Sequence, residues 1–397
     1  MKRLEKLFLI AIAVVVTSVS MQASTIFARQ YNMSCSGCHV GFPPMMNNTG
    51  MEFMRNGMRF SKDDKTTLRA ALDGEVVPVG FFAGGGYKKA DLSATTTVKN
   101  PQTGQMMQKA VEKSNEITNP TGNLFVAGSL SENLSTFIGG KYAYQKDENG
   151  DREIKLLGKK IYLQANLGET KHILRGGFIS PYNQFGNVSK ASENSGLSDV
   201  PNFFNSPLAM ANTKAIHGLE YTYLSDNGIM LLIAGGELAN SNDETNIVAG
   251  VNYFNGNNFR ISAIVNHITE NDTQEQKALY EPSEAILGER TTFMIPIEYQ
   301  FEYGFFNTAA VYTTNGLDKT GNKTDDYYGL ESSVTVPMFD TGKIRFVYTN
   351  DHESDQGYSL SFAQLMFDSV LISANAAKFK TDNADFESIL ASISYIY

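Results

Sequence analysis

The sequence has no tryptophan and only two cysteines and five histidines among its 397 residues. A structural zinc site normally requires four ligands close together, and His172, His217, His267 and His352 are scattered far from the cysteines. Charged residues make up only 19% of the chain and the net charge is −9. An acidic protein repels phosphates, so we expect no nucleic acid among its partners. The composition therefore disfavours both a zinc-stabilised fold and nucleic-acid binding.

Long apolar runs are also absent after the N-terminal segment, where no stretch approaches the roughly 18 residues of a transmembrane helix. The N-terminus itself begins with a basic region at Lys2, Arg3 and Lys6, followed by the apolar run 7–16 and by small residues up to position 24. This succession is typical of a secretory signal peptide. We predict that residues 1–23 are such a peptide and that the protein is exported.

The two cysteines stand together in the sequence Cys35-Ser36-Gly37-Cys38-His39. This spacing is that of c-type haem attachment: each thiol can form a thioether with the haem, and the adjacent histidine can supply an axial nitrogen to the iron. A dithiol–disulfide pair is the alternative, but a thioredoxin-like site needs a βαβ context that the sequence does not indicate. The motif predicts one covalent haem c on Cys35 and Cys38, with His39 as the proximal ligand. Electrons would then pass through the protein.

The remainder of the chain is rich in glycine, with 34 residues, and contains 25 Phe and 19 Tyr. Many of its segments alternate apolar and polar residues, which is the period of a β-strand. Strands with an apolar face that ends in aromatics are what a lipid-facing barrel needs. A soluble β-sandwich gives the same alternation. Clear examples are the segments 259–266, 292–300, 343–349 and 388–397.

Connection lengths separate the two architectures. Short turns, such as 131–133 and 168–170, alternate with longer loops, such as 180–212 and 269–289. Short turns on one rim and long loops on the other are typical of outer-membrane barrels. We predict sixteen strands near 79–90, 122–130, 134–145, 154–167, 171–179, 213–224, 229–237, 245–254, 259–268, 290–300, 305–314, 326–337, 343–350, 357–366, 369–379 and 385–397.

This pattern predicts a mainly β, 16-stranded antiparallel outer-membrane β-barrel that contacts outer-membrane lipid. An even strand number places both termini on the short-turn rim, which is periplasmic, and Tyr397 ends the chain as in a barrel signal. Sixteen strands would enclose a water-filled lumen, which the segment 180–212 could fold into and narrow. Pro296 cannot donate to a strand ladder, which predicts either a bulge or different strand boundaries there.

The segment around the cysteine motif resembles a known family. Its residues are similar to those of the fused monohaem cytochrome–porins, outer-membrane c-type cytochromes known as iron oxidases. The similarity in motif spans 27–57, and over the rest of the chain it is architectural. The matching positions are Phe27-Ala28-Arg29-Gln30, Met33, Cys35, Cys38, His39, Phe42-Pro43, Gly50, Phe53 and Asn56-Gly57.

The resemblance implies a small N-terminal α-helical monohaem cytochrome c module with its linker at residues 24–75, and a barrel at 76–397. It also implies that the protein oxidises extracellular Fe(II) and passes the electrons to periplasmic carriers such as cytochromes. Two alternatives stay open: outward transfer to an extracellular acceptor, and a porin or solute channel with a haem-bearing plug. A homo-oligomer is likewise left open.

The second axial ligand of the iron is not fixed by the sequence. Met51, Met54 and Met58 follow i, i+3, i+7 spacing and would share one helical face, while Met33 matches the family. His/Met ligation raises the reduction potential, which suits a donor such as ferrous iron. At most one methionine can ligate, and the alternative for each is simple packing around the porphyrin. His172, near the predicted periplasmic rim, is a further candidate.

Two arginines follow these methionines. Arg55 and Arg59 could pair with haem propionates or could face solvent. The charged run 62–65 is expected to be a solvated linker.

Overall fold

The computed structural model describes the chain from Ile26 to Ile396 with several gaps. The predicted signal peptide, 1–23, lies outside the described residues. The described ranges are 26–40, 46–99, 106–110, 114–117, 120–146, 152–168, 171–185, 215–238, 244–255, 258–269, 289–314, 326–338, 342–351, 356–366, 370–380 and 384–396.

Short helices precede the first strand. They are α2 (Ile26–Gln30), the single 3₁₀ turn η1 (Cys35–Gly37), α3 (Asn48–Arg55) and α4 (Thr67–Leu72). Asn47 and Thr66 cap α3 and α4 through side-chain oxygens that accept from the first-turn N–H groups. No helix among the described residues is long and apolar enough to cross a membrane.

The described strands form one antiparallel sheet that closes on itself, because β1 pairs with both β18 and β4. Sixteen of these strands, β1 and β4 to β18, make the closed barrel. Their bounds are Val79–Lys99, Thr121–Ser129, Leu134–Lys146, Arg152–Leu167, His172–Ile179, Ile216–Leu224, Ile229–Leu238, Thr245–Phe254, Phe259–Thr269, Arg290–Phe301, Gly304–Thr314, Tyr327–Met338, Gly342–Asp351, Gln356–Met366, Val370–Lys380 and Ala384–Ile396. The predicted strand number is confirmed, and each predicted strand overlaps an observed one.

The first strand is longer than predicted. β1 continues to Lys99, where the sequence predicts a loop, and β2 (Met106–Ala110) pairs with this extension at 95–99. β3 (Ser114–Ile117), also in the predicted loop, pairs with residues 87–90 of β1. The segment from Asp91 to Lys99 is mostly polar and lacks the apolar alternation that marks a lipid-facing strand. Backbone pairing here extends beyond the apolar belt, so the signal used to find strands is missing.

The two faces of the barrel wall differ in the way predicted for a membrane barrel. On β9, Leu231 and Ile233 point outward and are 49% and 56% exposed, whereas Met230 and Leu232 point inward and are buried. On β15, Phe346 is outward and Arg345 inward. Apolar side chains therefore cover the exterior, and the polar side chains of the strands face the lumen, as membrane barrels require.

Two irregularities have identifiable causes. The β11–β12 ladder is interrupted opposite Pro296, between the pairs Ile261–Ile297 and Ile264–Met294. The register on the two sides is the same, so the predicted bulge is wrong: proline only removes a donor here. A register shift does occur in the pairing of β5 with β6, directly after Lys141, which lies opposite Gly158.

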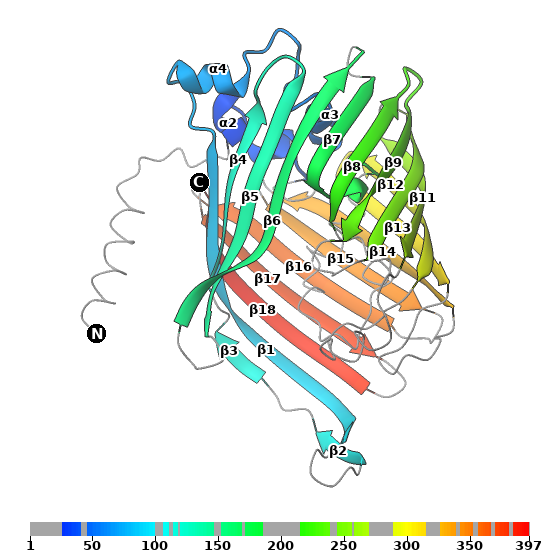
Figure 1. The fold of residues 1–397 in the computed structure, drawn as a ribbon. Coiled ribbons are helices and arrows are strands. Elements are labelled where there is room, and N and C mark those ends of the chain that lie inside the picture. The colour runs from blue at the N-terminus through cyan, green and yellow to red at the C-terminus, as the bar shows by residue number, and fades with distance from the viewer. Residues whose placement is uncertain are drawn as a thin grey trace, which may run out of the picture.

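The helices lie at the rim where the tight turns are, as Figure 1 shows for α2, α3 and α4. Arg29 donates to the carbonyls of Val77 and Val79 at the start of β1. Thr67, at the start of α4, and Ser129, at the end of β4, hydrogen-bond to each other through their backbone N–H groups and hydroxyls. β18 also ends at this rim, at Ile396 opposite Phe82.

A second segment enters the lumen from the wall. The 3₁₀ turn η2 (Pro181–Phe185) follows β7, and its Tyr182 and Phe185 are fully buried. The Phe185 ring lies so close to Gly250 of β10 that a Cβ there would approach it to 2.6 Å. The inward folding predicted for 180–212 is confirmed for 181–185, and 186–214 lie outside the described residues.

Candidate functional site

The cysteine motif forms a compact turn. Cys35–Gly37 is the 3₁₀ turn η1, closed by the Gly37 N–H donating to the Ser34 carbonyl at 3.1 Å. Cys38 carries a half-buried thiol, and His39, also half-buried, pairs with Met46 in an isolated antiparallel bridge. The motif's backbone is thus folded back on the residues that follow it.

Asn47 holds this turn in place. Its Nδ2 lies 3.0, 3.2 and 3.4 Å from the carbonyl oxygens of Ser36, Gly37 and His39 and donates to them. Its Oδ1 accepts from the Gly50 N–H at 2.9 Å. One side chain therefore caps α3 and fastens the cysteine motif to it. The sequence analysis missed Asn47, although a pair of asparagines before a helix is a capping signal.

The first turn of α3 packs directly on the motif. A Cβ at Gly50 would lie 2.0 Å from the Cys38 carbonyl oxygen, so only glycine fits. The Cys38 carbonyl also accepts from the Asn47 N–H at 3.0 Å. Glycine at position 50 belongs to the family resemblance, and this close approach gives it a physical reason.

Met51, Met54 and Met58 do not share one helical face, contrary to the prediction. α3 ends at Arg55, so Met58 lies beyond it in a left-handed conformation with φ of 65°. Chain reversal at Gly57, where φ is 70°, ends the helix and makes that prediction wrong. Met51 and Met58 are buried, while Met54 is half-buried.

The side chain of Met33 lies against the motif itself. Its Sδ and Cε lie against Gly37, and a Cβ added there would approach Cε to 2.3 Å. Met58 instead packs in the apolar cluster of the barrel wall and Phe53. The structure therefore brings Met33 to the cysteine turn and takes Met58 away into the module's core.

His172 lies on the outer wall. Its Nδ1 is 2.8 Å from the hydroxyl of Tyr221, which is 42% exposed on the lipid side. Its ring stacks with Tyr221 and packs at a tilt against Tyr223 in an aromatic group near the rim. Rings of this kind favour the membrane interface. His172 thus belongs to the exterior and not to the lumen.

Arg55 anchors the module inside the barrel. Its guanidinium donates to the Gln184 carbonyl at 2.7 Å and lies 3.4 Å from the Met230 Sδ, while its own carbonyl accepts from Gln164 and Asn166. Burial is the main cause, with the nearby Arg260 second, that lowers the pKa of Arg55 to about 9. The predicted solvent-facing role is therefore wrong for Arg55.

Arg59 is also engaged at the rim. Its guanidinium donates to the carbonyls of Lys62, at 3.0 Å, and of Glu132, in the turn between β4 and β5. Arg59 is only 4% exposed, so its solvent-facing alternative is wrong as well. The following run is solvated as expected, with Lys65 bridging the exposed carboxylates of Asp73 and Glu75.

On its other side the module reaches across the lumen mouth. Val40, next to His39, packs against Phe305 at the start of β13, and both are buried. The contacts of Arg59 lie at the β4–β5 turn and those of Arg55 at β6 and β9. The helical segment therefore touches the wall on several sides and occupies the short-turn end of the lumen.

Below the module the lumen wall carries buried ion pairs. Arg175 of β7 donates through two nitrogens to Glu220 of β8. Arg260 of β11 contacts Glu298 of β12 at 2.6 Å. Buried charges are tolerated only when paired and hydrogen-bonded, so these pairs fix the polar interior next to Arg55. Each pair joins residues far apart in sequence, which is why the sequence analysis did not find them.

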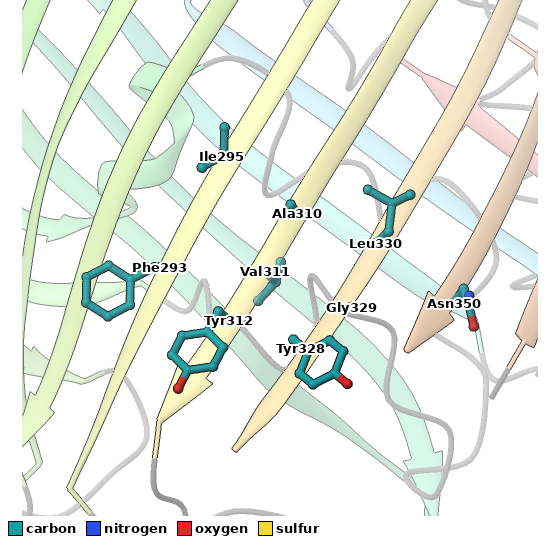
Figure 2. A pocket seen from close by; sticks show the side chains of 9 residues that line it. All are labelled: Phe293, Ile295, Ala310, Val311, Tyr312, Tyr328, Gly329, Leu330 and Asn350. Carbon is teal, nitrogen blue, oxygen red and sulfur yellow. The ribbon is translucent and has the colours of Figure 1, made fainter. Parts of the chain in front are cut away.

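A shallow apolar groove lies on the outer wall and not in the lumen. Figure 2 shows it between β12, β13 and β14, where the small residues Ala310 and Gly329 leave space between Phe293, Tyr312 and Tyr328. These aromatic side chains are exposed on the lipid side. The groove is a feature of the membrane-facing surface. Among the described residues, no three histidine, cysteine or carboxylate side chains gather as a metal site.

Comparison with known proteins identifies the architecture. No protein-family model and no curated protein matches the chain. Solved structures match along 80% of the chain, with a TM-score of 0.52 in each case: OmpF of Salmonella typhi in complex with daunomycin (10% identity, 97% of that chain), an anion-selective porin from Comamonas acidovorans (10%, 98%) and the outer membrane channel DcaP of Acinetobacter baumannii (9%, 96%). At such low identity the likeness shows the fold alone.

The fold and the distribution of side chains together define the class. A closed sixteen-stranded barrel with an apolar exterior and a polar interior spans a bilayer with its backbone groups paired. This chain is a porin-like β-barrel of the outer membrane.

Proposed function

We propose that this barrel carries one covalent haem c on Cys35 and Cys38, with His39 as an axial ligand, and moves electrons across the outer membrane. The observation that carries the proposal is the position of the Cys-x-x-Cys-His turn. It is tied by Asn47 to a helix whose last residue, Arg55, is anchored in the lumen. The fold comparisons do not bear on the haem.

The residues present fit such a group. The turn combines two cysteines at the required spacing with an adjacent imidazole, and Cys38 carries a thiol. Asn47 fixes the carbonyls of Ser36, Gly37 and His39, so the backbone between the attachment points is held in one conformation. A module of this size has little core of its own, and the barrel wall supplies its missing apolar contacts.

When bound, the haem supplies a one-electron redox couple. The chain's own residues hold and shield the attachment turn. The backbone of the half-buried His39 is held by its bridge to Met46, and Met33 covers Gly37 within the turn. Phe27, Tyr31 and Phe60 pack around Phe53 and exclude water behind the helix. Met33 is our preferred second ligand over Met51, Met54 and Met58, because its side chain lies on the motif.

The direction of transfer follows from the family resemblance. We propose that extracellular Fe(II) is the donor and that periplasmic cytochromes accept the electrons at the short-turn rim. Outward transfer to an extracellular acceptor would use the same haem and barrel. The two directions differ in the haem reduction potential that they require. Oxidation of Fe(II) needs a haem potential above that of its donor.

A solute channel with a haem-bearing plug is the second candidate. The porin fold favours it, since the matched structures include an anion-selective porin and an outer membrane channel. The N-terminal module and η2 occupy the lumen and meet where Arg55 contacts Gln184. This arrangement favours electron transfer through a barrel that is closed to solutes. Conductance in planar bilayers separates the two: only the channel predicts solute flux through the wild-type protein.

The test is a redox titration of the detergent-solubilised full-length protein, followed in the haem absorbance bands, with stepwise addition of Fe(II). A positive potential and reduction by Fe(II) support the proposal, and a strongly negative potential overturns inward transfer from iron. Cys35→Ala and His39→Ala should leave a membrane-inserted barrel and abolish Fe(II)-dependent electron transfer. Lys378→Gln, on an exposed ion pair with Glu387, serves as the control.

A further inference from the structure

We infer that the apolar groove on the outer wall between β12, β13 and β14 is a binding site for an acyl chain of lipopolysaccharide in the outer leaflet. The inference goes beyond the proposed function and does not depend on the haem. It distinguishes a site that retains one kind of lipid from the rest of the barrel exterior, which contacts exchanging bilayer lipid.

The groove lies where a small side chain stands in a row of larger ones. Ala310 pairs with Ile295 on one side and with Leu330 on the other, and all three point outward. The wall is therefore lower at Ala310, which leaves a groove of about 450 Å³. Clefts that bind small molecules and cofactors have volumes of about 300–1,000 Å³. Because the groove is continuous with the lipid-facing exterior, its occupant in the membrane is the apolar part of a lipid.

Aromatic side chains border the groove on the side of the long loops. Tyr312 pairs with Phe293 and with Tyr328 in the next outward row, and Figure 2 shows these rings beside the groove. The Tyr312 hydroxyl donates to the exposed carboxylate of Asp326, so this ring passes from an apolar to a polar environment. Aromatic girdles of barrels lie at the membrane–water interface. The groove therefore begins at the interface and extends toward the bilayer centre.

The groove faces the extracellular leaflet. The connections 270–289 and 315–326 lie at this end of the strands, whereas the short turn 302–303 joins β12 to β13 at the other end. The long loops of outer-membrane barrels are extracellular. The lipid beside the groove is therefore that of the outer leaflet, which consists mainly of lipopolysaccharide.

The amide of Asn350 favours this lipid over a phospholipid. Asn350 pairs with Leu330 and lies at the edge of the groove. Its Oδ1 has no hydrogen-bond partner in the part of the chain that the structure describes. An unpaired amide on a lipid-facing surface is costly, because no water is present to bind it. Acyl chains of lipopolysaccharide carry hydroxyl and amide groups, which phospholipid chains lack, and rotation about χ2 lets the Asn350 amide reach either as donor or acceptor.

The absence of tryptophan from the chain allows a direct test. Phe293→Trp places a fluorescent reporter in the groove. Phe346→Trp is the matched control, because Phe346 points outward on β15 without lining the groove, and the two phenylalanines are 47% and 45% exposed.

Each purified full-length protein is reconstituted into vesicles of brominated phosphatidylcholine, which quenches tryptophan on contact, with and without lipopolysaccharide. Quenching is expressed relative to the same sample in vesicles without bromine, so any effect of the haem on the fluorescence cancels. Mg²⁺ is present throughout, because a divalent cation screens the Asp326 carboxylate from the lipid phosphates.

Lipopolysaccharide should relieve the quenching at position 293 and leave the quenching at position 346 unchanged. In the Phe293→Trp protein, Ala310→Phe fills the groove and should abolish the relief. Ala376→Phe should not, although Ala376 also points outward between larger apolar side chains, on β17. Asn350→Leu should raise the lipopolysaccharide concentration needed for half of the relief about tenfold, which corresponds to about 1.4 kcal/mol. Heat-modifiable migration in detergent gels confirms that each barrel is folded.

Every other result overturns the site. Equal relief at positions 293 and 346 would mean that lipopolysaccharide surrounds the barrel without a preferred place. Quenching at position 293 that lipopolysaccharide does not relieve would assign the groove to phospholipid chains. A reporter at position 293 that is not quenched even without lipopolysaccharide would mean that protein, such as a second copy of this chain, covers the groove.

Discussion

The guanidinium of Arg55 donates to the main-chain carbonyl of Gln184 at 2.7 Å, across 129 positions of sequence. Arg55 ends the helix that follows the cysteine motif, and Gln184 lies in the turn that enters the lumen after β7. α3, which enters the lumen at the short-turn rim, therefore meets η2, which enters it after the other end of β7. This hydrogen bond joins the N-terminal helical module to η2, the two segments that occupy the lumen.

Replacing Arg55 should loosen that junction. Arg55→Met keeps much of the side-chain volume but removes the hydrogen bond to Gln184, and bonds to charged groups contribute about 1.5–3 kcal/mol. We expect faster proteolysis of the N-terminal segment in detergent-solubilised protein and a higher conductance in planar bilayers. Arg69→Met is the control, because Arg69 is exposed and its salt bridge is with its helix neighbour Asp73. Unchanged conductance together with unchanged proteolysis would contradict the role of Arg55.

The two roles of Asn47, capping α3 and holding the cysteine turn, should be separable by substitution. Asn47→Asp keeps the oxygen that caps α3 but removes the three donations from Nδ2 to the motif, whereas Asn47→Ala removes both. The lost cap should cost about 1 kcal/mol. We expect a lower yield of covalent haem in both variants and an additional loss of helix stability in the alanine variant alone. Haem absorbance per protein and limited proteolysis measure the two effects. Wild-type haem yield in Asn47→Ala would show that the turn forms without this side chain.

Neighbouring positions on β16 should respond in opposite ways to the same charge. Leu360 is 54% exposed on the lipid side, whereas Ser361 is half-buried on the lumen side. Leu360→Glu should destabilise the barrel, though by less than the about 2–4 kcal/mol of a lysine at the bilayer midplane, because the charge faces lipid. Ser361→Glu should cost much less, because it faces the lumen opposite Arg345. Urea unfolding in lipid vesicles gives both values. Equal costs at the two positions would mean that the faces of β16 are assigned wrongly.

The Arg175–Glu220 pair should behave as a coupled unit. Glu220→Gln leaves the Arg175 charge buried without its counter-ion and should cost about 3–5 kcal/mol. The double variant Arg175→Met with Glu220→Gln should cost less than the sum of the single variants, since no uncompensated charge remains. A double-mutant cycle of unfolding free energies measures the coupling, and a strictly additive cycle would show that the two groups do not interact.

The strand positions were predictable because a barrel wall imposes a strict alternation. Each residue on β11, such as Ile261 or Ser262, must face either lipid or lumen, and the sequence records that choice at every second position. The same reasoning failed on the extension of β1 beyond Asp91, where no lipid contact selects apolar residues. It also failed at Pro296, where sequence suggested a bulge and the register stayed unchanged.

The cysteine motif was visible in the sequence, but its surroundings were not. A helix N-cap such as Asn47 has a local signal, whereas the contacts of Arg55 and Val40 depend on residues more than a hundred positions away. The helical spacing of Met51, Met54 and Met58 suggested a common face, because the chain reversal at Gly57 was not recognised.

The sequence by itself determined the alternating strands, the barrel and the Cys-x-x-Cys-His turn, since each depends on the order of neighbouring residues along the chain. Only the tertiary structure decided that Arg55 meets Gln184 and that Val40 meets Phe305. The physical reason is closure. Once the strands join into a barrel, inward side chains from distant strands share one enclosed space, and no local pattern states which of them come together.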